Sequence, residues 1–237
     1  MAYQHKRILV KLSGELLRTS PEETLSGAAV QEVAESLALL QKDGIEFGLV
    51  IGAGNLFRGL KSEKMGFDRV IGDQIGMLGT VMNAMAVKEA LAGVGVKAHV
   101  MAPQHISSLV MPLNQQLARS FIQQHEPVLF AGGTGNPFFT TDSAATLRAL
   151  EINASLLVKA TKVKGVYSAD PLTDPKAVRY EKLTFDEALQ KKLRVMDQTA
   201  VALAREYGVS IFVYKFGEPR SILEAMGTAG AGTYIVP

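Results

Sequence analysis

Short apolar runs alternate with amphipathic segments along most of the chain. The runs have the length and composition of strands that are covered on both faces. Between them, apolar residues recur at helical spacing, as at Val30, Val33 and Leu37. This alternation predicts an α/β fold, a three-layer αβα sandwich with a mainly parallel central sheet. The expected strands lie within 7–15 and at 47–51, 96–101, 127–131, 155–159, 210–214 and 233–236, and the expected helices at 30–40, 69–91, 113–124, 143–151, 185–192, 197–207 and 222–226.

The most informative stretch is a glycine-rich corner that follows the expected strand 127–131. Gly132, Gly133 and Gly135 can adopt positive φ and let a ligand approach the backbone closely. We expect Asp142, at the end of the stretch, to cap the next helix. A strand that leads through glycines into a helix start is how α/β proteins hold phosphate groups. A tight capped turn without a ligand would show a similar pattern of glycines.

Three further strands end in residues suited to ligands. The first ends at Lys11, which is either a phosphate ligand or an edge lysine that extends into water. The second leads into 52–59, where neither phosphate motif fits: Phe57 replaces the last glycine of G-x-G-x-x-G, and Leu60 replaces the lysine of a Walker loop. The third leads into 160–171, which is either a ligand loop or a solvated basic hairpin. Ligands in such sheets bind beyond the carboxyl ends of the strands, so we expect these segments to converge.

The segment 69–91 is expected to form one long helix that is apolar on most of its sides. Such a helix belongs in a large core or at a subunit interface, and we treat a subunit contact as a hypothesis. Asp73 near its start either interacts with the helix dipole, which the pattern alone favours, or binds ligand hydroxyl groups. A membrane span is not expected, because five polar residues interrupt the segment. These are Asp73, Gln74, Asn83, Lys88 and Glu89.

Composition narrows the function classes only slightly. A formal charge of +2, from 25 basic and 23 acidic residues that alternate along the chain, gives no reason to expect nucleic acid or membrane binding. Without cysteine, disulfides and thiol-based metal sites are excluded, and the four histidines lack metal-ligand spacing. The N-terminus has no signal-peptide pattern, so we expect a cytoplasmic protein. We find no linker in the 237 residues and expect a single domain over 1–237.

Four segments together resemble the bacterial uridylate (UMP) kinases of the amino-acid-kinase superfamily. They are 11–14 (KLSG), 52–58 (GAGNLFR), 133–142 (GTGNPFFTTD) and 159–167 (KATKVKGVY). The pattern K-x-x-G-V-[YF]-x-x-D-P, from Lys162 to Pro171, is shared across the superfamily. The GTGNPFFTTD segment is much more specific to UMP kinases. The similarity extends in order over nearly the whole chain.

The resemblance implies transfer of the γ-phosphoryl group of ATP to UMP, giving UDP and ADP. Mg²⁺ would be held by the ATP phosphates without a protein metal ligand, and the protein would be a homo-oligomer, typically a hexamer. The implied catalytic residues are Lys11, Asp142 and Lys159. The implied ATP side consists of Lys11, Leu12, Ser13, Gly14, Gly54, Arg58, Thr161, Tyr167 and Asp170. The implied UMP side consists of Ala53, Asp73, Thr134, Gly135, Asn136, Pro137, Phe138, Phe139, Thr140 and Thr141.

Two features differ from the family pattern. Ala53 stands where many relatives have a third glycine, which is tolerated if φ there is negative. Residues 19–26 (TSPEETLS) lack the G-F-G-I-D-like segment linked with GTP activation, so the resemblance does not extend to GTP regulation. Two alternatives remain: a kinase of the same superfamily that phosphorylates a carboxylate or carbamate, and a non-catalytic nucleotide sensor. The presence of Lys11, Asp142 and Lys159 argues against a sensor.

Overall fold

The computed structural model describes residues 5–57, 65–106, 108–171, 173–193, 196–217 and 221–237. Within these residues the strands form one nine-stranded sheet in the order β4-β3-β5-β2-β1-β6-β8-β9-β7. Neighbouring strands run parallel except for the antiparallel pair β8 and β9. The expected mainly parallel sheet is therefore confirmed.

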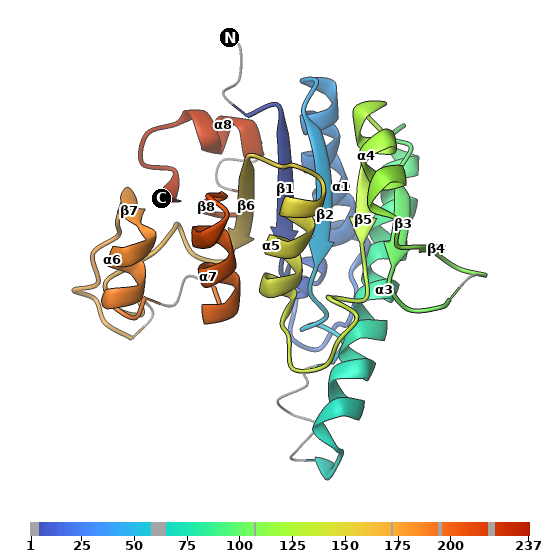
Figure 1. The fold of residues 1–237 in the computed structure, drawn as a ribbon, viewed down its shortest axis with the longest axis horizontal. Helices are drawn as coiled ribbons and strands as arrows, with labels where there is room; N and C mark the ends of the chain where they lie inside the picture. The colour runs from blue at the N-terminus through green and yellow to red at the C-terminus, as the bar shows by residue number, and fades with distance from the viewer. Residues whose placement is uncertain (1–4, 58–64, 107, 172, 194–195, 218–220) are drawn as a thin grey trace.

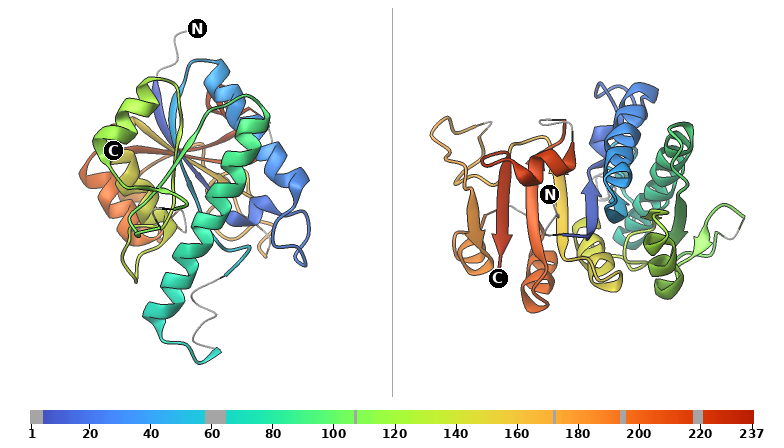
Figure 2. Two further views of the ribbon diagram at one scale, coloured as in Figure 1. Left: turned by 90° about the vertical axis from the view of Figure 1, so that its right-hand side faces the viewer. Right: turned by 90° about the horizontal axis from the view of Figure 1, so that it is seen from above.

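Helices cover both faces of this sheet, as Figures 1 and 2 show. α1, α3 and α8 lie on one face, and α4, α5, α6 and α7 lie on the other. The strands are β1 (Arg7–Leu12), β2 (Glu46–Ile51), β3 (His99–Ala102), β4 (Met111–Pro112), β5 (Val128–Phe130), β6 (Leu156–Thr161), β7 (Lys182–Thr184), β8 (Ser210–Lys215) and β9 (Gly232–Val236). The helices are η1 (Gly14–Leu17), α1 (Gly27–Lys42), α3 (Arg69–Gly93), α4 (Gln115–Gln123), α5 (Thr141–Glu151), α6 (Phe185–Gln190), α7 (Gln198–Glu206) and α8 (Ile222–Gly227).

The two faces of β1 show why the sheet has a core on each side. Successive strand residues point to opposite faces, so Ile8 and Val10 enter the core beneath α1 and α3. Leu9 enters the core beneath α5 and α7, and Lys11 follows it on that same face two residues later. The alternation therefore directs the only charged side chain within the apolar run 8–12 toward the start of α5.

Several elements differ from the sequence prediction. The strand expected at 96–101 begins only at His99, because the Val96 amide instead donates to Leu91 O and closes the end of α3. The short strands β4 and β7 were not predicted, since two or three residues give no readable alternation. The one-turn helix η1 was not predicted either. Ser13 caps its start, because the Ser13 hydroxyl oxygen accepts from the Glu15 amide.

Helix α3 extends beyond the body of the fold at its N-terminal end, as Figures 1 and 2 show. Its length and hydropathy would suit a membrane crossing, but core helices share these properties and one side of α3 packs against α1. Another side is open in the single chain and carries an apolar row that we call the α3 stripe: Ile71, Leu78, Met82 and Met85, which are 37–56% exposed. Large exposed apolar patches mark interaction sites.

Candidate active site

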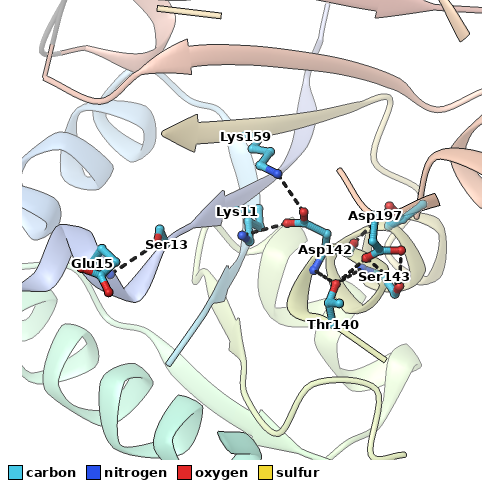
Figure 3. Close-up of polar contacts among 9 residues, drawn as sticks. Lys11, Ser13, Glu15, Thr140, Asp142, Ser143, Lys159 and Asp197 are labelled. Carbon is cyan, nitrogen blue, oxygen red and sulfur yellow. Dashed lines mark hydrogen bonds and ion pairs between the residues drawn. The ribbon is translucent and has the colours of Figure 1, made fainter. Parts of the chain in front are cut away.

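A carboxylate between two lysines occupies the carboxyl end of the sheet (Figure 3). Lys11 on β1 and Lys159 on β6 are register partners in adjacent parallel strands, so their side chains leave the sheet side by side. Lys11 Nζ lies 2.8 Å from Asp142 Oδ1, and Lys159 Nζ lies 2.7 Å from Asp142 Oδ2. We call these three residues the charge centre. The structure thus brings together the three residues that the resemblance implied to be catalytic.

Burial and charge act in opposite directions within the charge centre. Burial raises the pKa of the Asp142 carboxyl, but the two ammonium groups lower it more, so this pKa lies below its ordinary value. Asp142 is therefore ionised at neutral pH. Burial lowers the pKa of Lys159, and Asp142 only partly opposes this. The site holds one more positive than negative charge, which suits it to bind an anion.

The start of α5 corrects one sequence prediction. Thr140, not Asp142, caps the helix: its hydroxyl oxygen accepts from the amides of Asp142 and Ser143. Asp142 lies in the first turn, which leaves both of its carboxylate oxygens available to the lysines. Thr140 also donates its hydroxyl proton to Asp197, the capping residue of α7. Ser143 Oγ lies 3.0 Å from both Asp197 oxygens, so Asp197 joins α7 to the turn that presents Asp142.

The glycine-rich corner encloses a small cavity of about 140 Å³, the corner cavity. Gly132, Gly133 and Gly135 all have positive φ, as expected from the sequence. Seven of the implied UMP-side residues line the cavity, whereas Gly135, Pro137 and Phe138 do not. The complete lining is Ala53, Phe57, Asp73, Gly76, Met77, Thr80, Gly133, Thr134, Asn136, Phe139, Thr140 and Thr141.

Asp73 connects α3 to this corner. It lies beyond the first turn of α3, which Asp68 caps, so the expected helix-dipole role is wrong. Its carboxylate accepts from Arg69 Nε at 2.9 and 3.0 Å and from the Phe138 amide at 2.8 Å. Phe138 has a positive φ of 71°, a conformation that costs energy in a non-glycine residue and is typical of functional loops. Asp73 thus holds the corner in a defined conformation.

Two larger cavities lie on the other side of Asp142. The lysine cavity has a volume of about 410 Å³. It is lined by Asp142, Lys159 and Asp197 and by part of the segment 188–193, including Lys192 and Leu193. The tyrosine cavity, about 560 Å³, is lined by 165–171 and neighbouring residues. It includes the predicted residues Tyr167 and Asp170. Lys192 and Leu193 line both cavities, so the two adjoin.

The remaining implied ATP-side residues have different surroundings. Thr161 lines none of these three cavities, but its hydroxyl donates to Val163 O and accepts from the Val163 amide, which shapes the turn beside the tyrosine cavity. Leu12 is fully buried, and Gly54 lies in the turn after β2. Arg58 lies outside the described residues.

A buried amide pair joins the first two strand ends to α3. Asn83 is fully buried and donates to Gly52 O and to Asn55 Oδ1, both at 2.8 Å. Asn55 in turn donates to Thr24 O at 2.6 Å. Only glycine fits at position 14, because a Cβ there would lie 2.3 Å from both Asn55 Oδ1 and Gly52 O. The amide pair thus fixes the backbone beside the charge centre.

Position 53, where alanine replaces the third glycine found in many relatives, is compatible with this arrangement. Ala53 has no positive φ, so a Cβ is tolerated at this position. Its side chain packs toward Gly79 of α3, where an added Cβ would lie only 2.9 Å away.

Sequence reasoning missed three groups that shape the site: Asp197, the Asn55–Asn83 pair and Lys192. In the sequence Asp197 is simply the first residue of a predicted helix. Asn83 interrupts an apolar helix, and a lone amide inside such a helix is itself a signal of a buried polar contact. Among the described residues, no group of three or more His, Asp or Glu side chains is placed to hold a metal ion.

The fold and the site define a class, an αβα protein with a net-positive charge centre at the carboxyl edge of its sheet. Comparison with known proteins identifies the family. The model of the amino acid kinase family matches residues 6–215. The chain therefore belongs to the amino acid kinase family.

The similar proteins place the chain more narrowly. A uridylate kinase of Ectopseudomonas mendocina is 45% identical over 232 residues, which are 98% of this chain and 94% of the relative. Among solved structures, a UMP kinase from Bacillus anthracis is 34% identical with a TM-score of 0.93, covering 98% of this chain and 96% of that one. A UMP kinase from Ureaplasma parvum is 30% identical, also with a TM-score of 0.93, covering 99% and 100%. Within its family, the chain belongs with the uridylate kinases, which confirms the resemblance.

Proposed function

We propose that this protein transfers the γ-phosphoryl group of ATP to UMP, giving UDP and ADP in pyrimidine nucleotide biosynthesis. The observation that carries the proposal is the position of the charge centre. Asp142 and Lys159 line the lysine cavity, while Thr140 and Thr141, directly before Asp142, line the corner cavity. One ligand space thus contains Lys159, and the other lies next to the turn that presents Asp142 to both lysines. A transfer between two phosphates requires two such spaces close to positive charge.

We assign the donor to the lysine and tyrosine cavities. The nucleoside of ATP binds in the tyrosine cavity beside Tyr167 and Asp170, and its phosphates extend through the lysine cavity toward Lys159 and Lys11. The combined volume of the two cavities, about 410 and 560 Å³, is ample for a nucleotide. Ser13, Gly14, Gly54, Arg58 and Thr161 complete this side in the proposal.

We assign UMP to the corner cavity. Asp73 accepts hydrogen bonds from the ribose hydroxyl groups, and the corner from Thr134 to Thr141 surrounds the remainder of the nucleotide. At about 140 Å³ the cavity is smaller than typical ligand pockets of about 300–1,000 Å³. UMP binding therefore displaces corner side chains. The half-exposed Phe139, which lines the cavity, is the first of these.

The charge centre stabilises the transferring group. Phosphoryl transfer depends on positioning and on neutralising negative charge, and involves little covalent chemistry of the protein. Lys11 and Lys159 supply the positive charges at the γ-phosphate. Asp142 keeps both ammonium groups pointing to one place before ATP arrives, so little reorganisation is needed when it binds.

Mg²⁺ enters this proposal with ATP. Both oxygens of Asp142 are engaged by lysines, and the Asp197 carboxylate accepts from Thr140, Ser143 and the Ala200 amide. The carboxylate oxygens of Asp142 and Asp197, the two acidic residues of the lysine cavity, are therefore already occupied by protein donors and are not available to a metal ion. A Mg²⁺ ion held by phosphate oxygens and water fits these surroundings. When bound, it shields charge on the phosphates that Lys11 and Lys159 contact.

We also propose that the chain acts as a single domain over 1–237, in the cytoplasm where its substrates are found, as a homo-oligomer. One sheet runs through the whole described chain, which supports one domain. The α3 stripe supports self-association, and the resemblance favours a hexamer. Light scattering at micromolar concentration tests this: a monomeric mass contradicts it. Met82→Glu should weaken association, whereas Val178→Glu, at a residue exposed outside the stripe, should not.

Activity is tested by ADP release from Mg-ATP with separate acceptors. We expect turnover selective for UMP over CMP and dUMP, and measurements with and without GTP establish any activation. Turnover with aspartate, acetylglutamate or carbamate instead would identify the carboxylate or carbamate kinase. No turnover with any acceptor, together with nucleotide binding, would identify the sensor.

A matched pair of variants tests the charge centre in the same assay. Lys11→Ala should keep the circular dichroism spectrum but lower kcat by about 10²–10³-fold, the range for loss of a group that stabilises transition-state charge. Lys42→Ala removes the same charge at the exposed end of α1 and should leave kcat unchanged. Near-normal turnover of Lys11→Ala would remove Lys11 from the mechanism.

A further inference from the structure

Lys192 lies just beyond the C-terminal end of helix α6, in a conformation that lysine rarely adopts. Its φ is +52°. Its amide donates to Leu189 O, and the Leu193 amide donates to Ala188 O, both at 3.0 Å. These two bonds form a Schellman motif, in which glycine is the preferred residue at this position because it has no Cβ. The chain keeps a lysine where local backbone preference favours glycine, and such conflicts are expected at functional sites.

The backbone of this motif places Lys192 where two cavities meet. Lys192 lines the lysine cavity together with Asp142 and Lys159, and it also lines the tyrosine cavity. The preceding residue differs: of these two cavities Lys191 lines the tyrosine cavity and not the lysine cavity, and its ammonium group lies 4.8 Å from the centre of the Tyr180 ring. The left-handed turn thus separates the two lysines and directs only the second to the junction.

The charge of Lys192 changes the balance of the lysine cavity. The other ionisable residues of its lining are Asp142, Lys159 and Asp197, which together carry one net negative charge. Asp197 is already engaged at the start of α5 by Thr140 and Ser143. Within the described part of the chain, the Lys192 ammonium forms no hydrogen bond or ion pair with another residue. Lys192 is exposed at the cavity mouth, so a polyanion entering there meets an available cation.

We propose that Lys192 binds the α- and β-phosphates of the donor nucleotide between the tyrosine cavity and the charge centre. This inference rests on the proposed donor assignment. The contact is made to phosphates that ATP and ADP share and that do not change during transfer. It therefore contributes equally to binding the ground state and the transition state, and so affects KM for ATP and product inhibition by ADP, but not kcat.

Lys192→Gly is the most informative variant, because it removes the charge while it relieves the left-handed backbone. We expect KM for ATP and the inhibition constant of ADP to rise together by about 3–10-fold, the size of one exposed charge-assisted contact. The kcat and the KM for UMP should not change, and the melting temperature should stay the same or rise. Lys192→Glu should raise KM for ATP more than Lys192→Gly does. Lys192→Arg keeps the positive charge and should therefore have a KM for ATP close to that of the wild type. All these differences should shrink in high salt.

Lys176→Ala serves as the matched control. It removes an equal charge from an exposed position that lines neither cavity, so KM for ATP should not change. The inference is overturned if Lys192→Gly and Lys192→Glu both keep the wild-type KM for ATP, or if Lys176→Ala raises it equally. Failure of the proposed function is a separate result, in which the wild type does not phosphorylate UMP. Calorimetric titration of Mg-ADP into the wild type and Lys192→Gly then tests the phosphate contact by itself.

Discussion

Replacing Asp142 with asparagine removes the negative charge between two buried ammonium groups. Their nitrogens lie 2.7 and 2.8 Å from its oxygens, and the three side chains are only 11–14% exposed. At an effective dielectric constant of about 20, one such attraction at about 3 Å amounts to about 5–6 kcal/mol before desolvation is counted. Loss of one partner from a buried ion pair typically destabilises a protein by about 3–5 kcal/mol. In a chain of this length we expect the melting temperature to fall by about 6–20 °C.

Added ATP distinguishes this explanation from general damage to the fold. The phosphates supply the negative charge that the variant lacks, so Mg-ATP should raise the melting temperature of Asp142→Asn more than that of the wild type. Thermal unfolding followed by circular dichroism, with and without Mg-ATP, measures both shifts. Asp186→Asn is the control, because its ion pair with Arg205 is more than half exposed. The reasoning fails if Asp142→Asn has the same melting temperature as Asp186→Asn. It also fails if Mg-ATP raises the melting temperature of Asp142→Asn by no more than that of the wild type.

Three other perturbations test separate contacts of the site. Asp73→Asn should raise KM for UMP by about 10–100-fold, since a neutral amide accepts hydrogen bonds more weakly than a carboxylate. Initial rates at varied UMP and ATP concentrations measure this, and an effect confined to KM for ATP would reverse the assignment of the two nucleotide sites. Burial lowers the pKa of Lys159, so its ammonium loses its proton, and kcat/KM declines, at a pH below the ordinary lysine pKa of about 10.4. Lys159→Arg should move that decline to higher pH, and an unchanged pH profile would assign it to another group. Asn83→Ala leaves Gly52 O and Asn55 without their buried partner, so chemical denaturation should show a loss of about 1–3 kcal/mol; wild-type stability would mean that water replaces the amide.

The glycine-rich corner was predictable because its signals are local. A buried run, three glycines and a hydroxyl-rich segment follow one another within 127–142, and each has one dominant structural cause. The position of Lys11 was predictable for a similar reason, since the carboxyl ends of parallel strands share one edge. The capping residue of α5 was not predictable, because Thr140 and Asp142 both suit a helix cap. Asp142 instead forms ion pairs with Lys11 and Lys159, which lie far away in the sequence.

The contacts that the sequence did not reveal connect residues far apart in the chain. Asp197 reaches Thr140 and Ser143 across more than 50 positions, and Asn83 reaches Asn55 across 28. A local pattern can mark Asn83 as a residue with a buried polar contact, but it does not identify Asn55 as the partner, and it gives no reason to pair Asp197 with Thr140 or Ser143. Lys192 is a different case. A lysine suits the C-terminal end of a helix, and only the positive φ in the structure shows that this lysine has a second constraint.

The pairing of Lys11 with Lys159 across β1 and β6 limits how this protein can change over evolutionary time. The two lysines meet because each lies at a fixed count along its strand, on the same face of the sheet. Substitutions elsewhere in these strands keep that count, whereas insertion or deletion of one residue before Lys11 would turn its side chain to the α1 face. We therefore expect functional homologues to differ in loop length and in side chains, but to preserve the lengths of β1 and β6.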